Sequence, residues 1–102
     1  MQQQIRYAKV AAASNGSNEI VAAVAGKIIR VLGYHLSHSG TVNSKWQSAS
    51  TDLTGLNYGT AGVIAHEDQT RDGHFETAAG EALNLNLSAG TAVGGYISYL
   101  LY

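Results

Sequence analysis

The chain of 102 residues contains no cysteine and no proline. Without cysteine there is no disulfide, no thiolate nucleophile and no cysteine-ligated zinc. Without proline, turns have to be formed by Gly, Asn, Asp and Ser, which tolerate the required backbone angles or hydrogen-bond to their own backbone. The 12 glycines can supply many such turns.

Charge is also scarce. Charged residues make up 13% of the chain, whereas an average soluble domain has about 25%. The formal net charge is −1, and no basic stripe is present to neutralise phosphates. We therefore expect neither nucleic acid nor an anionic membrane as a partner. We also expect no signal peptide and no membrane span, because basic residues interrupt the N-terminal segment and no apolar run is long enough.

What the chain does have is a series of short strand-like runs separated by clusters of Gly, Asn, Ser and Asp. These runs cover residues 5–12, 19–25, 27–37, 41–48, 62–65, 74–77, 83–87 and 92–102. We expect the second and third runs to form a hairpin at Gly26. About eight strands with polar turns predict an all-β chain with one domain, residues 1–102. Its expected fold is an antiparallel β-sandwich, specifically a jelly roll.

Two of these runs identify core residues. The run 83–87 alternates strictly, which predicts leucines facing inward and asparagines facing outward. Trp46, the only tryptophan, shares strand parity with Val42 and is predicted to lie in the core. The alternative for Trp46 is an exposed ring that stacks on a sugar.

At Gly94 and Gly95 we expect a bulge or a close backbone approach.

Candidate catalytic and metal-binding residues form no known pattern. The polar segment 66–74 could bring together imidazoles and carboxylates around a divalent ion, from His66, Glu67, Asp68, Asp72 and His74. Its spacing matches no metal motif, so an exposed loop is the simpler interpretation. His35 and His38 fall on opposite sides of a strand, and nothing selects a glycosidase pair among Asp52, Asp68 and Glu81. We predict no enzyme activity, no cofactor and no bound metal.

The final run has apolar or aromatic side chains at both parities, so both faces of this strand are expected to be covered. It is either a central strand with one face under a loop or a strand whose outer face packs on another subunit. The low charge favours the second interpretation, because interfaces are enriched in Tyr and depleted in Lys and Glu. The predicted interface residues are Tyr96, Tyr99, Leu101 and Tyr102, with an extended N-terminal segment formed by Gln2, Gln3, Gln4 and Ile5.

Three segments, 18–32, 51–55 and 75–88, together resemble small virion structural proteins of tailed bacteriophages and prophages. The most specific part is FETAAGEALNLNLS at residues 75–88. Relatives tend to have a more hydrophobic or proline-bearing segment where this chain has residues 66–74. The resemblance implies a capsid decoration (cement) protein at the virion surface, a trimer that binds the major capsid protein and stabilises the phage head. Two alternatives stay open: a head-fibre or tail-associated module, and a carbohydrate-binding module for host attachment.

Overall fold

The computed structural model describes residues 4–102, which form ten β-strands and no helix. No helix in this part of the chain could therefore cross a membrane. The strands are β1 (Arg6–Ala12), β2 (Gly16–Val21), β3 (Ile29–His38), β4 (Val42–Ser48), β5 (Thr51–Asp52), β6 (Asn57–Gly59), β7 (Ile64–Glu67), β8 (Phe75–Glu76), β9 (Leu83–Leu87) and β10 (Val93–Leu101).

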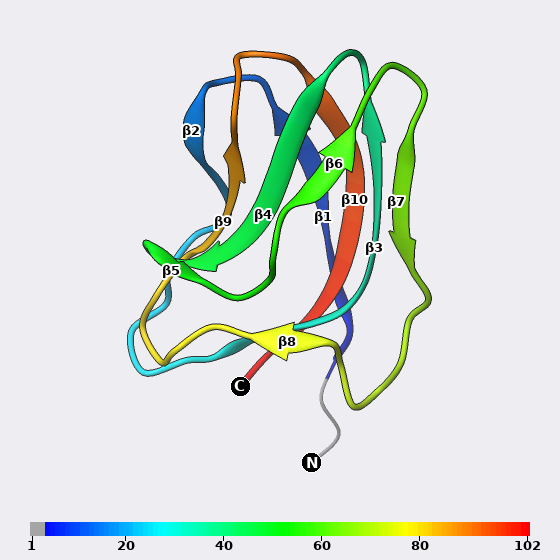
Figure 1. Ribbon diagram of the computed structural model, residues 1–102. Coiled ribbons are helices and arrows are strands. Elements are labelled where there is room, and N and C mark those ends of the chain that lie inside the picture. The colour runs from blue at the N-terminus through cyan, green and yellow to red at the C-terminus, as the bar shows by residue number, and fades with distance from the viewer. Residues whose placement is uncertain (1–3) are drawn as a thin grey trace.

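The strands form two antiparallel sheets packed face to face (Figure 1). The first sheet has the order β1-β10-β3-β7, with β8 also paired to β3. The second has the order β2-β9-β4-β5, with β6 also paired to β4. Strands β7 and β8 together form one interrupted edge strand, and β5 and β6 form another. Counted in this way, the strand order is that of an eight-stranded jelly roll. The predicted all-β sandwich is confirmed.

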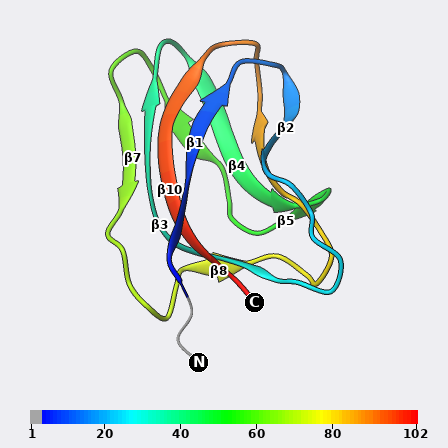
Figure 2. The same ribbon diagram turned by 180° about the vertical axis from the view of Figure 1, so that it is seen from behind.

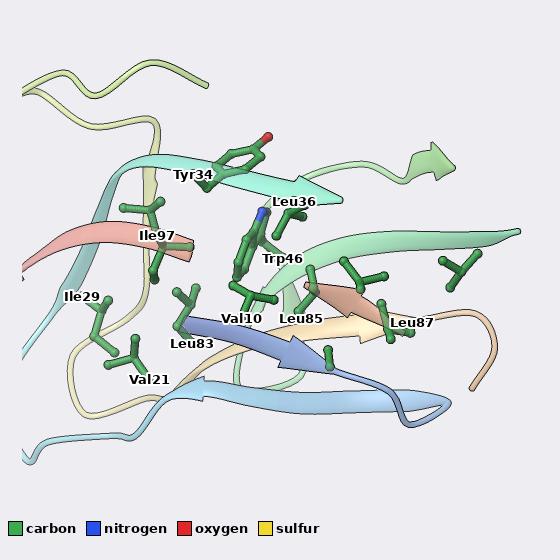
Figure 3. Packing of buried hydrophobic residues seen from close by; sticks show 14 residues of the cluster. Val10, Val21, Ile29, Tyr34, Leu36, Trp46, Leu83, Leu85, Leu87 and Ile97 are labelled. Atoms are coloured by element: carbon green, nitrogen blue, oxygen red, sulfur yellow. The ribbon is translucent and has the colours of Figure 1, made fainter. Parts of the chain in front are cut away.

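The core fills the space between the sheets and is built from alternate residues of the long strands (Figure 3). Trp46 is completely buried, as predicted, with its ring centroid 5.6 Å from that of Tyr34 and 5.9 Å from that of Phe75. The leucines of β9 are also buried, while its asparagines face outward, as the alternation predicted. Each fully buried leucine contributes about 1.5–3 kcal/mol, so β9 is a principal source of stability.

The predicted hairpin between residues 19–25 and 27–37 is wrong. Strand β2 begins at Gly16, before the predicted run, and ends at Val21, and residues 22–25 are exposed. A turn does occur at Gly26, where φ is 74°, but it leads from the second sheet to the first. Strand β2 pairs with β9, and β3 pairs with β10. Three of residues 22–25 are alanines, which bury little area, so this segment cannot hold a place in a sheet against better apolar strands.

Other boundaries differ by a few residues. The run predicted at 62–65 is β7, displaced by two residues, so His66 and Glu67 lie in a strand and not in a loop. The run predicted at 74–77 is the two-residue strand β8. Strands β5 and β6 were not predicted, because residues 51–59 show no apolar alternation. All of these are short edge strands.

Strands β3 and β10 are the centre of the first sheet, and two irregularities shape their pairing. A Cβ built on Gly95 would lie 1.8 Å from the carbonyl oxygen of His35, so the close backbone approach predicted for the glycine pair is confirmed. The bulge lies further along, where Ser98 pairs with Gly33 and Tyr99 pairs with Val31. Leu32 is the extra residue on β3. Positions of both parities on β3 can therefore face the core.

Candidate functional site

The outer face of the first sheet, which points away from the core, carries a row of large side chains. Four positions are in register across four strands: Lys9 on β1, Tyr96 on β10, His35 on β3 and His66 on β7. The rings of Tyr96 and His35 are stacked with centroids 5.7 Å apart, and those of His35 and His66 meet edge to face at 5.5 Å. Figure 2 shows these four strands from the side on which β1 lies along β10.

The next row on the same face is made of small residues. Tyr7 on β1 is in register with Ser98 on β10, which is in register with Gly33 on β3. Since Ser98 and Gly33 have little or no side chain, a hollow of about 250 Å³ opens above them. Tyr7 and Tyr96 flank it and are 68% and 51% exposed. The full lining is Tyr7, Gly33, Tyr34, His66, Glu67, Asp68, Gln69, Tyr96 and Ser98.

The wall of the hollow at the β7 side is the segment 67–69, which lies directly against Gly33. A Cβ at Gly33 would be 2.9 Å from the backbone N and Cα of Gln69 and 3.0 Å from the carbonyl oxygen of Glu67. The next residue, Thr70, donates its backbone N–H to the carbonyl of Leu32 at 2.9 Å. Glycine at position 33 is thus what lets this wall approach β3.

Each of the two carboxylates of the wall lies near a histidine. His66 Nε2 lies 2.8 Å from Asp68 Oδ1, and His74 Nδ1 lies 3.7 Å from Glu67 Oε2. His74 Nε2 donates to the backbone carbonyl of Asp68 at 2.8 Å. The side chain of Asp68 is 92% exposed and that of Glu67 is 51% exposed. Within residues 4–102, no group of three or more His, Asp or Glu side chains is placed to hold a metal ion.

Tyr34 connects the hollow to the core. Its ring packs edge to face on Trp46, with the hydroxyl pointing away from the buried cluster (Figure 3). Burial raises the pKa of the Tyr34 hydroxyl, and the carboxylate of Glu67, its cross-strand partner, raises this pKa further. The hydroxyl therefore stays protonated at neutral pH and can act as a hydrogen-bond donor.

The predicted interface residues within the described part of the chain differ in their surroundings. Gln2 and Gln3 lie outside the described residues. Gln4 is exposed and Ile5 is half-buried. Tyr99 and Leu101 are partly buried and pack against the core of their own chain.

The remaining two predicted interface residues are Tyr96, which flanks the hollow, and Tyr102, which accepts a hydrogen bond from Arg30 of the same chain. Arg30 Nη2 lies 2.6 Å from the hydroxyl of Tyr102 and 2.9 Å from Glu76 Oε1, with the guanidinium carbon 4.9 Å from the Tyr102 ring centroid. The hydrogen bonds that Arg30 donates to the carboxylate of Glu76 raise the pKa of Arg30. Arg30 thus links the end of the final strand to β8. The two apolar faces that motivated the interface prediction therefore make many contacts within the chain itself, and the interface stays a prediction for all of these residues.

The other candidates lie away from the hollow. Asp52 accepts hydrogen bonds from Gln47 at 2.8 Å and from Lys45 at 3.1 Å, which lower the pKa of its carboxyl group. Glu81 accepts a hydrogen bond from Ser48. The burial of Trp46 removes the ring on which the sugar-binding alternative depended.

Sequence analysis missed the hollow, although one signal for it exists. In the first run, Tyr7 has the parity opposite to that of the core residues Val10 and Ala12, which places a tyrosine outside. The role of Ser98 and Gly33 as its floor depends on the register between β3 and β10, which the sequence does not display.

No protein-family model matches the sequence, and no curated protein matches it significantly. Among solved structures, the fold is similar to that of a protein of the Bacillus endospore appendages, which are described as a novel family of disulfide-linked pili. The TM-score is 0.52 and the sequence identity 15%, over 100% of this chain and 90% of the other. This likeness shows a shared β-sandwich fold.

Proposed function

We propose that this protein is a structural protein of a bacteriophage virion, a capsid decoration protein that binds the major capsid protein and stabilises the head. It acts by binding and performs no catalysis. The resemblance of residues 18–32, 51–55 and 75–88 to small virion proteins supports the assignment to the particle. The jelly-roll arrangement agrees with the fold that this resemblance implies.

The observation that carries the binding role is the outer face of the first sheet. Tyr7, Ile64 and Tyr96 are 68%, 55% and 51% exposed there, on strands whose opposite sides contribute residues to the core or pack against it. Exposed aromatic side chains on a rigid sheet are typical of protein interfaces, where Tyr is enriched. A standard interface buries about 800 Å² per partner, a small part of the 5342 Å² accessible surface of this chain.

The mode of assembly differs from that described for the structural neighbour. The endospore appendages are disulfide-linked pili, whereas this chain has no cysteine. Attachment and any trimer formation in this protein therefore do not use disulfide bonds. In a trimer, three modest contacts to the shell reinforce one another, because the second and third contacts form at a high effective concentration.

The first experiment is to count the copies of this chain in purified virions relative to the major capsid protein, by quantitative mass spectrometry. A number comparable to that of the capsid protein is expected. A few copies per particle would instead place the protein at a fibre, vertex or tail, and complete absence would contradict any virion role.

The binding face is tested with stripped heads and purified protein. The double variant Tyr7→Ala, Tyr96→Ala should lose binding to the heads while remaining folded. The matched control is Tyr58→Ala, which removes a tyrosine that is 74% exposed on β6 of the second sheet. Equal binding by the double variant and the control would move the interface to another face.

A further inference from the structure

We propose that the hollow over Ser98 and Gly33 is a binding site for one basic side chain of a partner protein, preferably arginine. The class of ligand is argued from the hollow alone. That the partner is the shell protein rests on the proposed function.

The charge of the lining favours a cation. Glu67 and Asp68 are the carboxylates among the nine lining residues, and no Lys or Arg is among them. The one histidine of the lining, His66, lies 2.8 Å from Asp68 Oδ1. The nearby cation Lys9 is in register with Tyr96 on the side of β10 away from β3, and it does not line the hollow. A guanidinium entering here would meet the carboxylate of Glu67 and no Lys or Arg, and it would share Asp68 with His66.

The aromatic walls favour arginine over lysine. Tyr7 and Tyr96 offer exposed ring surface at two sides, and a guanidinium both stacks on aromatic rings and bonds to carboxylates in a planar fork. The same chain already contains such an arrangement, in which Arg30 bonds to Glu76 and lies 4.9 Å from the ring centroid of Tyr102. The combination of tyrosine and carboxylate is thus one that this fold uses internally.

The size of the hollow favours a side chain over a larger ligand. Pockets for drug-sized molecules measure about 300–1,000 Å³, and this hollow measures about 250 Å³. Its wall and floor are closely packed, because the backbone of segment 67–69 lies directly against Gly33. One side chain projecting from a partner's surface fits this space, whereas an oligosaccharide would extend beyond it.

The test is an NMR titration of the folded, isotope-labelled chain with blocked arginine. The probes for comparison are blocked citrulline, which has the same shape without the charge, blocked lysine and a neutral hexose. We expect saturable shifts of the amide signals of residues 33, 67–69 and 96–98 with arginine, with a dissociation constant of roughly 1–10 mM. Lysine should bind more weakly, and citrulline at least roughly tenfold more weakly.

Variants locate the site. Tyr96→Ala and Glu67→Gln should each weaken arginine binding roughly two- to fivefold, while Tyr58→Ala leaves it unchanged. The amide spectrum of each variant shows whether it is folded. If Tyr96→Ala does not fold, Glu67→Gln still tests the site, because glutamine has nearly the same shape as glutamate. Binding of the hexose in preference to arginine, equal binding of citrulline, shifts at a different surface, or no saturable shift would each overturn the proposal.

The outcome is separable from that of the proposed function. Absence from virions together with arginine binding would leave the cation site standing and remove the shell partner. Presence in virions without arginine binding would reject only the proposal that the hollow binds a basic side chain.

Discussion

The contact between Gly95 and the neighbouring strand makes a sharp prediction for stability. Gly95 has φ of 145°, a conformation that other residues rarely adopt, and a Cβ there would lie 1.8 Å from the carbonyl oxygen of His35. Replacing Gly95 with alanine costs about 1–3 kcal/mol in backbone strain alone. The strands must also separate locally, which weakens hydrogen bonds worth about 0.5–1.5 kcal/mol each. We expect Gly95→Ala to lower the free energy of unfolding by at least about 3 kcal/mol, a large part of the 5–15 kcal/mol typical of a domain.

The adjacent glycine provides the control. At Gly94 a Cβ would lie 3.7 Å from the carbonyl oxygen of Val10, an ordinary contact. Gly94→Ala should therefore stay within about 1 kcal/mol of the parent, because the lost flexibility of the unfolded chain offsets small packing costs. Urea unfolding monitored by tryptophan fluorescence measures both. If the two variants have the same stability, the reasoning about the β3–β10 contact is wrong.

Three further predictions concern the buried side chains and one surface carboxylate. Trp46→Ala should lower the free energy of unfolding by about 3–5 kcal/mol, because the ring is completely buried. Since this variant lacks the only tryptophan, its urea unfolding is followed by circular dichroism, and a loss below about 1 kcal/mol would mean that the ring is not buried. Thr77→Val should lower the free energy of unfolding by about 1–3 kcal/mol, since Thr77 Oγ1 accepts a buried hydrogen bond from the backbone N–H of Ile29 at 3.0 Å. The control Thr77→Ser keeps the hydroxyl and should lower the free energy of unfolding by less. The hydrogen bond from Gln47 lowers the pKa of Asp52 below its ordinary value of 3.8, so the stability it provides is present above that pH and is lost as the pH falls through the lowered value. Asp52→Asn should thus be less stable than the parent at neutral pH and equal to it in strong acid, and a difference that persists in acid would contradict the assignment.

Side-chain periodicity predicted the elements in which large apolar residues alternate with polar ones. The leucines of residues 83–87 and the parity of Trp46 were identified correctly, because a wrong register would expose a leucine or an indole at a cost of several kcal/mol. The segment 22–25 failed for the opposite reason. Because its alanines bury little apolar area, the free energy of folding depends little on which strand this segment pairs with. The partner of β2 is instead set by the leucines of β9, which are distant in the sequence.

The candidate site was harder to predict than the fold. The polar character of residues 66–74 was evident, and the structure places His66, Glu67 and Asp68 at the hollow. Its other half comes from β1 and β10, and these meet the wall only through long-range strand pairing. A floor of Ser98 and Gly33 has no chemical signature in the sequence, because small residues are informative only once their neighbours are known.

The two flanks of the sandwich differ in how readily they can be extended. On one flank the sheets end in short, interrupted strands: β5 and β8 have 2 residues each, β6 has 3 and β7 has 4. On the other they end in β1, with 7 residues, and β2, with 6, which are consecutive in the chain and in contact. Short edges discourage unwanted strand addition, whereas a long edge can template it. Addition of a further strand to this sandwich is thus easier along β1 and β2 than on the opposite flank.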